Sequence, residues 1–169
     1  MTPADFASLY AAELPYVWKS LRRLGVHPND LDDLTQEVFT TAFVRFETFD
    51  QQRPLRPWLF GIAFRVAKAN RTRVFRSREV AQEPAFELED EGLRPDQQAE
   101  NRRAMARVLK ALEALPIDRR AVFILHDIEG QSVPEAAATL AIPVNTAYSR
   151  LRVARAEFVE AFHKSETHP

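Results

Sequence analysis

The sequence predicts an all-α protein made of two small helical domains that a flexible linker joins. Apolar residues recur at spacings of three and four along most of the 169-residue chain, which is the period of amphipathic helices. The chain has only four glycines and no alternation of apolar and polar residues, so we expect no strands. Residues 79–98 lose the helical pattern and carry seven acidic residues and two prolines, which is typical of a linker. The domains predicted on either side are residues 1–78 and 99–169.

Composition excludes several classes of protein. No apolar stretch is long enough to span a membrane, and the N-terminus lacks the basic and apolar regions of a signal peptide, so we expect a cytoplasmic protein without membrane insertion. The absence of cysteine excludes disulfides, thiol catalysis and the usual zinc-finger ligands. We expect no catalytic residues, no metal and no cofactor. The net charge of −1 hides a strong segregation of charge, which matters more for a nucleic-acid binder than the total.

The first helical segment follows an apolar stripe from Phe6 to Leu24. Pro15 interrupts this stripe, and proline removes a helical hydrogen bond and kinks or breaks a helix. We therefore predict two helical pieces bent at Pro15, the second of which ends at Gly25.

The next predicted helix begins near Asn29 or Asp30, either of which can cap it, and runs to Phe46. Its outer side is acidic, and we call it the acidic face: Asp32, Asp33, Gln36 and Glu37. Carboxylates in the first turns are favoured by the helix dipole, by about 0.3–1 kcal/mol each, and this benefit alone can account for the face. Alternatively, the face docks a basic protein partner.

Residues 51–78 carry eight basic residues and no acidic ones: Arg53, Arg56, Arg65, Lys68, Arg71, Arg73, Arg76 and Arg78. A polar loop, Phe49–Arg56, leads into a predicted helix with Pro57 in its first turn. On that helix Arg65, Lys68 and Arg71 project outward at spacings of three, and we call these three residues the basic ridge. A solvated face normally mixes both signs, whereas an unbroken positive series beside an aromatic loop suits a single DNA strand with an unstacked base.

Residues Glu129–Phe158 predict a helix-turn-helix. Ser132 and Glu135 form a capping box that starts the first helix, Leu140–Ile142 make the turn, and Pro143 fits the first turn of the second helix. Asn145, Ser149 and Arg152 point away from the buried stripe of the second helix, and we call them the recognition face. Such a helix enters the major groove of DNA.

The same patterns are compatible with three alternative structures. The two C-terminal helices can be an ordinary hairpin with a solvated polar side. The chain can also be a stand-alone helix-turn-helix DNA-binding transcriptional regulator, although that leaves the basic ridge without a role. Glu160 and His163 have the Glu-x-x-His spacing of di-iron bundles, but such a site needs a second copy of the motif and two more carboxylates.

Four motifs in order resemble the extracytoplasmic-function (ECF) group of sigma-70-type sigma factors: Asp32–Phe39, Pro57–Ala63, Leu112–Pro116 with Arg120, and Glu129–Arg155. The resemblance covers nearly the whole chain. It implies a sigma region 2-like helical bundle and a sigma region 4-like helix-turn-helix domain in a promoter-specificity subunit of RNA polymerase. The implied partners are core polymerase, through its β′ clamp helices and its β subunit, promoter DNA as duplex and as melted strand, and an anti-sigma factor.

The resemblance also implies a role for each surface. The acidic face would dock on the β′ clamp helices. The element near minus ten would be opened and read by Phe49, Asp50, Arg53, Arg56, Trp58, Arg65, Lys68 and Arg71. The element near minus thirty-five would be bound by Arg119, Arg120, Pro143, Asn145, Thr146, Tyr148, Ser149, Arg150, Arg152 and Arg155. Ala141 stands at the turn position often held by glycine, where a positive φ would store about 1 kcal/mol of strain.

Overall fold

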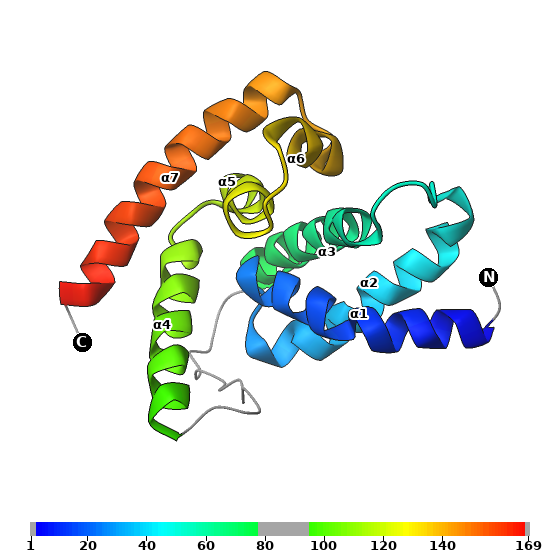
Figure 1. The fold of residues 1–169 in the computed structure, drawn as a ribbon, viewed down its shortest axis with the longest axis horizontal. Helices are drawn as coiled ribbons and strands as arrows, with labels where there is room; N and C mark the ends of the chain where they lie inside the picture. Colours follow the sequence, from blue (N-terminus) through cyan, green and yellow to red (C-terminus); the bar gives the residue numbers. More distant parts are fainter. Residues whose placement is uncertain (1–2, 78–94, 168–169) are drawn as a thin grey trace.

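The computed structural model describes residues 3–77 and 95–167, which form two groups of helices (Figure 1). The first group is α1 (Pro3–Arg23), α2 (Leu31–Arg45) and α3 (Leu55–Ser77). The second is α4 (Pro95–Glu113), α5 (Ile117–Phe123), α6 (Val133–Leu140) and α7 (Val144–Thr167). No strand occurs in these ranges, so the all-α prediction is confirmed. None of the described helices is both long and apolar enough to cross a bilayer.

Helix α1 differs from the sequence prediction. We expected two pieces bent at Pro15, but one helix runs from Pro3 to Arg23 with the proline inside it. Pro15 is exposed, so water can take the place of the hydrogen bond that the proline removes.

The predicted end of α1 at Gly25 is confirmed. Gly25 has a φ of 88°, its N–H donates to the carbonyl of Arg22, and the N–H of Val26 donates to the carbonyl of Leu21. This pair of bonds is a Schellman motif, which favours glycine at the left-handed position.

Helix α2 packs against α1 and α3, which also contact each other, and its apolar stripe is buried as predicted. Leu31, Leu34, Val38 and Ala42 are buried, and the charged residues at intervening positions face outward. Burial of this stripe, rather than intrinsic helix propensity, supplies most of the stability of such a helix.

Helix α7 is the longest helix of the second group and packs against α4, α5 and α6 (Figure 1). Helix α4 begins at Pro95, inside the segment predicted as linker, because proline is well tolerated in the first turn of a helix. The rest of that segment lies outside the described residues. A π turn, Ile124–Ile128, follows α5 and was not predicted.

The two groups pack against each other. Helix α1 contacts α4, α3 contacts α6, and one apolar cluster continues from Val17 and Leu59 in the first group to Leu112 and Ala137 in the second. The predicted division into two domains therefore becomes, in this structure, two helical groups that share a core.

Candidate nucleic-acid interface

The helix-turn-helix is built by a capping box and a left-handed turn. The hydroxyl of Ser132 accepts from the N–H of Glu135 at 3.3 Å, and the Glu135 carboxylate accepts from the N–H of Ser132 at 2.7 Å. The Ser132 hydroxyl also donates to this carboxylate at 2.7 Å, and that bond, together with the one from the N–H of Ser132, favours the charged form and lowers the pKa of Glu135. Ala141 then reverses the chain with φ 53° and ψ 47°, and its N–H donates to the carbonyls of Ala137 and Ala138. The expected strain at Ala141 is therefore present.

Buried small residues hold the second helix of this motif in place. Ala136 and Ala137 on α6 and Ala147 and Ala154 on α7 are each at most 1% exposed, which permits close approach of the two helices. Pro143 precedes α7 and its carbonyl accepts from the N–H of Ala147, so it caps the helix rather than occupying its first turn as predicted. The orientation of α7 is thus fixed by packing.

The recognition face is open to solvent. Asn145, Ser149 and Arg152 are all exposed on α7, and Tyr148 beside them is 54% exposed. Thr146 is half-buried. Polar side chains at the N-terminal end of such a helix can reach base edges in the major groove.

The arginines at the margins of α7 are positioned by carboxylates. Two guanidinium nitrogens of Arg155 donate to Asp127 at 2.9 and 2.6 Å, and this hydrogen bonding raises the pKa of Arg155. Arg119, on the neighbouring helix α5, forms an ion pair with Glu157 of α7 at 2.9 Å. Such bonds hold a long side chain in one geometry, although surface pairs add little stability.

Arg120 lies elsewhere than the resemblance implied. It is only 1% exposed, and its guanidinium donates to the carbonyls of Leu24, Glu113 and Leu115 at 2.7–2.9 Å. Because these carbonyls enclose the cation, we leave Arg120 out of the DNA-facing surface.

The basic ridge projects from α3 as predicted. Arg65, Lys68 and Arg71 are exposed, whereas Asn70 on the same helix is buried and accepts from Arg73 at 2.8 Å. Arg65 has a lowered pKa because of partial burial and the nearby positive charge of Arg45.

Two cations predicted for minus-ten DNA contact carboxylates that lie far away in the sequence. Arg56 donates to Glu13 at 2.9 Å, which raises the pKa of Arg56, and Lys68 donates to Asp118 at 2.7 Å. No local sequence signal pairs residues separated by 43 and 50 positions. Carboxylates therefore neutralise part of the positive charge of residues 51–78 in the folded chain.

The loop before α3 carries an aromatic cluster beside an open cavity. Phe49 stacks at a tilt on Trp58 with ring centroids 4.6 Å apart. Phe46, predicted from the sequence as the end of the preceding helix and not as a DNA contact, lies within 6.2 Å of both rings. Asp50 accepts from the N–H of Gln52 and forms an ion pair with Arg53, which orders the loop. The cavity measures about 610 Å³ and is lined by Asp5, Leu9, Phe46, Glu47, Phe49, Gln51, Arg53 and Leu55. A cavity of this size with aromatic walls suits an unstacked base.

The acidic face lies on the outer side of α2. All four of its side chains are exposed, and within residues 3–77 and 95–167 none of them forms an ion pair. An unneutralised acidic surface favours a basic partner.

The di-iron alternative, based on the spacing of Glu160 and His163, has no support in the described part of the chain. No group of three potential metal ligands occurs there, and Glu160 accepts a hydrogen bond from Lys164 at 2.6 Å.

Comparisons with known proteins point in the same direction. Residues 9–76 match the family described as Sigma-70 region 2, and residues 105–158 match the family described as Sigma-70, region 4. The chain is 33% identical over 164 residues to the RNA polymerase sigma factor CnrH of Cupriavidus metallidurans, covering 90% of this chain and 83% of that protein. It is 32% identical over 158 residues to the ECF RNA polymerase sigma factor SigE of Mycolicibacterium smegmatis, covering 89% of this chain and 60% of SigE.

Solved structures of related proteins have a similar fold. CnrH in complex with the cytosolic domain of CnrY superposes with a TM-score of 0.67 at 28% identity, covering 96% of this chain and 90% of that one. The sigma factor RpoE in complex with the anti-sigma factor NepR from Bartonella quintana superposes with a TM-score of 0.71 at 25% identity, covering 94% of this chain and 97% of that one.

Proposed function

We propose a role for each exposed surface in transcription initiation, because the chain belongs to the ECF group of the sigma-70 family of RNA polymerase sigma factors. It binds core RNA polymerase, directs the enzyme to specific promoters and assists strand opening. The observation that carries this function is the presence of region 2 and region 4, in that order, on one chain. A stand-alone helix-turn-helix regulator is disfavoured, because region 2 has no role in it.

The acidic face on α2 is our proposed docking surface for polymerase. Asp32, Asp33, Gln36 and Glu37 are exposed together, and the opposite side of the helix is buried in the core. The face would contact the clamp helices of the β′ subunit. Charge complementarity of this kind speeds association and fixes register.

The basic ridge and the aromatic loop form the proposed minus-ten surface. Cations on α3 follow the phosphates of one strand, while the cavity beside Phe49 and Trp58 holds a base that has left the stack. Unstacking a base costs a few kcal/mol, which contacts in this pocket would offset.

The recognition face on α7 is the proposed minus-thirty-five surface. Asn145 and Ser149 lie where side chains meet base edges, and Arg152 and Arg155 lie where phosphates pass. Polymerase performs the synthesis, so this chain needs no catalytic group or cofactor, and it acts in the cytoplasm where polymerase works. Relatives crystallised with CnrY and with NepR suggest that an anti-sigma factor also binds this chain.

Co-elution with core polymerase tests the function. The variant Asp33→Arg with Glu37→Arg should lose association with core while keeping its helical content, because like charges then face each other. Glu100→Arg, a charge reversal at an exposed position of α4, is the matched control and should bind normally. Core binding by the double variant at wild-type affinity would contradict the docking surface, and failure of the wild type to bind core would contradict the function.

A further inference from the structure

Two apolar side chains are exposed at the start of α7, the helix whose recognition face is the proposed minus-thirty-five surface. Val144, the first residue of α7, is 41% exposed, and Tyr148 is 54% exposed. Residues four apart on a helix are neighbours on its surface, and we call these two the apolar pair. Single exposed apolar residues are ordinary, whereas two neighbours on a binding surface indicate a contact.

The core of the protein does not use the apolar pair. The stripe of α7 that faces the core is Ala147, Leu151 and Ala154, each at most 4% exposed. Within residues 3–77 and 95–167, Tyr148 forms no hydrogen bond and no ring contact. Both side chains are therefore available to a partner.

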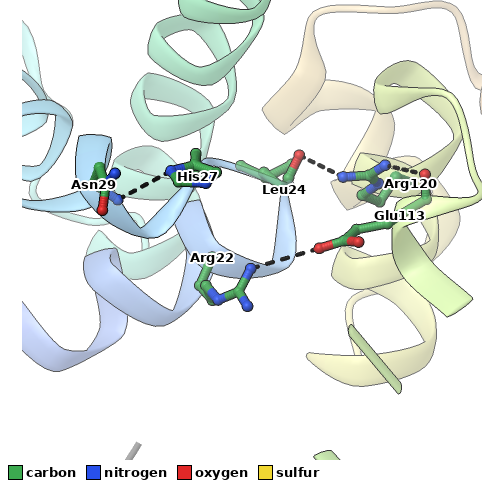
Figure 2. Close-up of polar contacts among 6 residues, drawn as sticks. All are labelled: Arg22, Leu24, His27, Asn29, Glu113 and Arg120. Carbon is green, nitrogen blue, oxygen red and sulfur yellow. Dashed lines mark hydrogen bonds and ion pairs between the residues drawn. The ribbon is translucent and has the colours of Figure 1, made fainter. Parts of the chain in front are cut away.

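Several arginines near this surface are engaged within the protein. Arg120 donates to the carbonyls of Leu24 and Glu113 (Figure 2), and Arg119 and Arg155 form ion pairs with carboxylates. The first six residues of α7 include no arginine or lysine. A bidentate arginine is the commonest specific contact to guanine, and the N-terminal end of this helix does not offer one. Its exposed side chains are short polar groups and the apolar pair.

The major groove of DNA presents one kind of methyl group. Every base pair shows hydrogen-bond donors or acceptors there, and thymine alone adds a methyl group at C5. Contact between this methyl group and an apolar side chain removes both from water, which is favourable in proportion to the area buried. Side chains of a helix lean toward its N-terminus, and the N-terminal residues of a recognition helix meet the base edges. The apolar pair is therefore placed where thymine methyl groups lie.

We propose that Val144 and Tyr148 read the 5-methyl groups of thymines in the promoter element near minus thirty-five. This inference rests on the proposed function and names a base for part of that surface. Asn145 and Ser149 lie one position further round the helix, so hydrogen bonding and methyl contact read the groove side by side. Loss of one methyl group should weaken binding about three- to fivefold.

Replacement of thymine by deoxyuridine tests this readout, because deoxyuridine pairs with adenine in the same way and lacks only the methyl group. Holoenzyme reconstituted from the full chain and core polymerase first selects promoters from random DNA. Each thymine of the selected element near minus thirty-five, on either strand, is then replaced singly, and competition measures the affinity of holoenzyme for each duplex. At one or more positions the replacement should weaken binding about three- to fivefold.

Variants of the apolar pair connect this loss of affinity to the protein. In Val144→Ala or Tyr148→Ala holoenzyme, deoxyuridine should cause no further loss at the thymine that the missing side chain contacts, which is the coupling that a double-mutant cycle measures. Tyr148→Phe keeps the ring and should keep the loss. Val159→Ala is the matched control and should also keep it, because Val159 is 52% exposed nearer the other end of α7. All three positions are exposed, so the variants should keep the helical content of the wild type.

The outcomes separate this inference from the proposed function. The inference is overturned, while the function stands, if the selected element contains no thymine, if no deoxyuridine weakens binding, or if the loss persists in both alanine variants. If holoenzyme enriches no element near minus thirty-five, the proposed function of this surface fails and the inference fails with it.

Discussion

Replacing Ala141 with glycine should stabilise the chain, because the turn of the helix-turn-helix holds Ala141 in the left-handed region. Its φ of 53° and ψ of 47° place the Cβ against the following carbonyl, which costs an L-residue roughly 1–2 kcal/mol. The methyl group is exposed, so removing it loses little packing. The greater conformational freedom of glycine in the unfolded chain offsets part of this stabilisation, by roughly 0.5–1 kcal/mol. We expect Ala141→Gly to raise the free energy of unfolding by about 0.5–1 kcal/mol.

Ala138 provides the matched control, since it is an exposed alanine of the same helix with ordinary helical geometry. Ala138→Gly should lower the free energy of unfolding by about 1 kcal/mol. Urea unfolding followed by circular dichroism measures both variants. We expect the change from alanine to glycine to raise the free energy of unfolding at position 141 and to lower it at position 138. Destabilisation by both substitutions would refute the strain assigned to Ala141.

Three further predictions concern the two proposed DNA-binding surfaces and the carboxyl group of Glu129. Replacing Lys68 and Arg71 with alanine should weaken open-complex formation and flatten its salt dependence by about one unit of log–log slope per lost phosphate contact. Permanganate reactivity of unpaired thymines measures strand opening. Unchanged opening with unchanged salt dependence would contradict a role of the basic ridge in this step. Ser149→Ala should change base preference near minus thirty-five while leaving core affinity unchanged, and a selection from random DNA that returns the wild-type sequence would contradict this role. Burial raises the pKa of Glu129, although hydrogen bonding from Tyr16 and the positive charges of Arg23 and Arg56 act in the opposite direction. The folded state therefore binds more protons than the unfolded state just above pH 4.5. Stability should therefore fall as pH rises from about 4.5 through the raised pKa, and Glu129→Gln should remove this component of urea unfolding curves; an unchanged pH profile would contradict it.

Features set by local sequence could be predicted. Ser132 and Glu135 are three residues apart, Ala141 follows the last apolar residue of a helix, and Gly25 follows a stripe, so each depends on short-range geometry. The buried positions of α2 and the exposed acidic and recognition faces follow from helical period alone. Matches to both sigma regions confirm the family suggested by motif order.

Contacts between segments that lie far apart in the sequence could not be predicted. The resemblance implied that Arg120 contacts DNA. Its position in the motif does not reveal that its side chain donates to the carbonyl of Leu24, 96 residues away. Glu13 and Asp118 neutralise cations that appeared unopposed in the sequence. The continuation of α1 through Pro15 is permitted by exposure of that turn, which only the packed structure shows.

Selection of promoters from random DNA by reconstituted holoenzyme, followed by transcription from the selected templates, tests the central claim most directly. The account predicts enrichment of two short elements at a fixed spacing, with transcripts that begin at a fixed distance downstream only when chain and core polymerase are both present. The contradictory result is a single site bound by the chain alone, with no transcript when core polymerase is added.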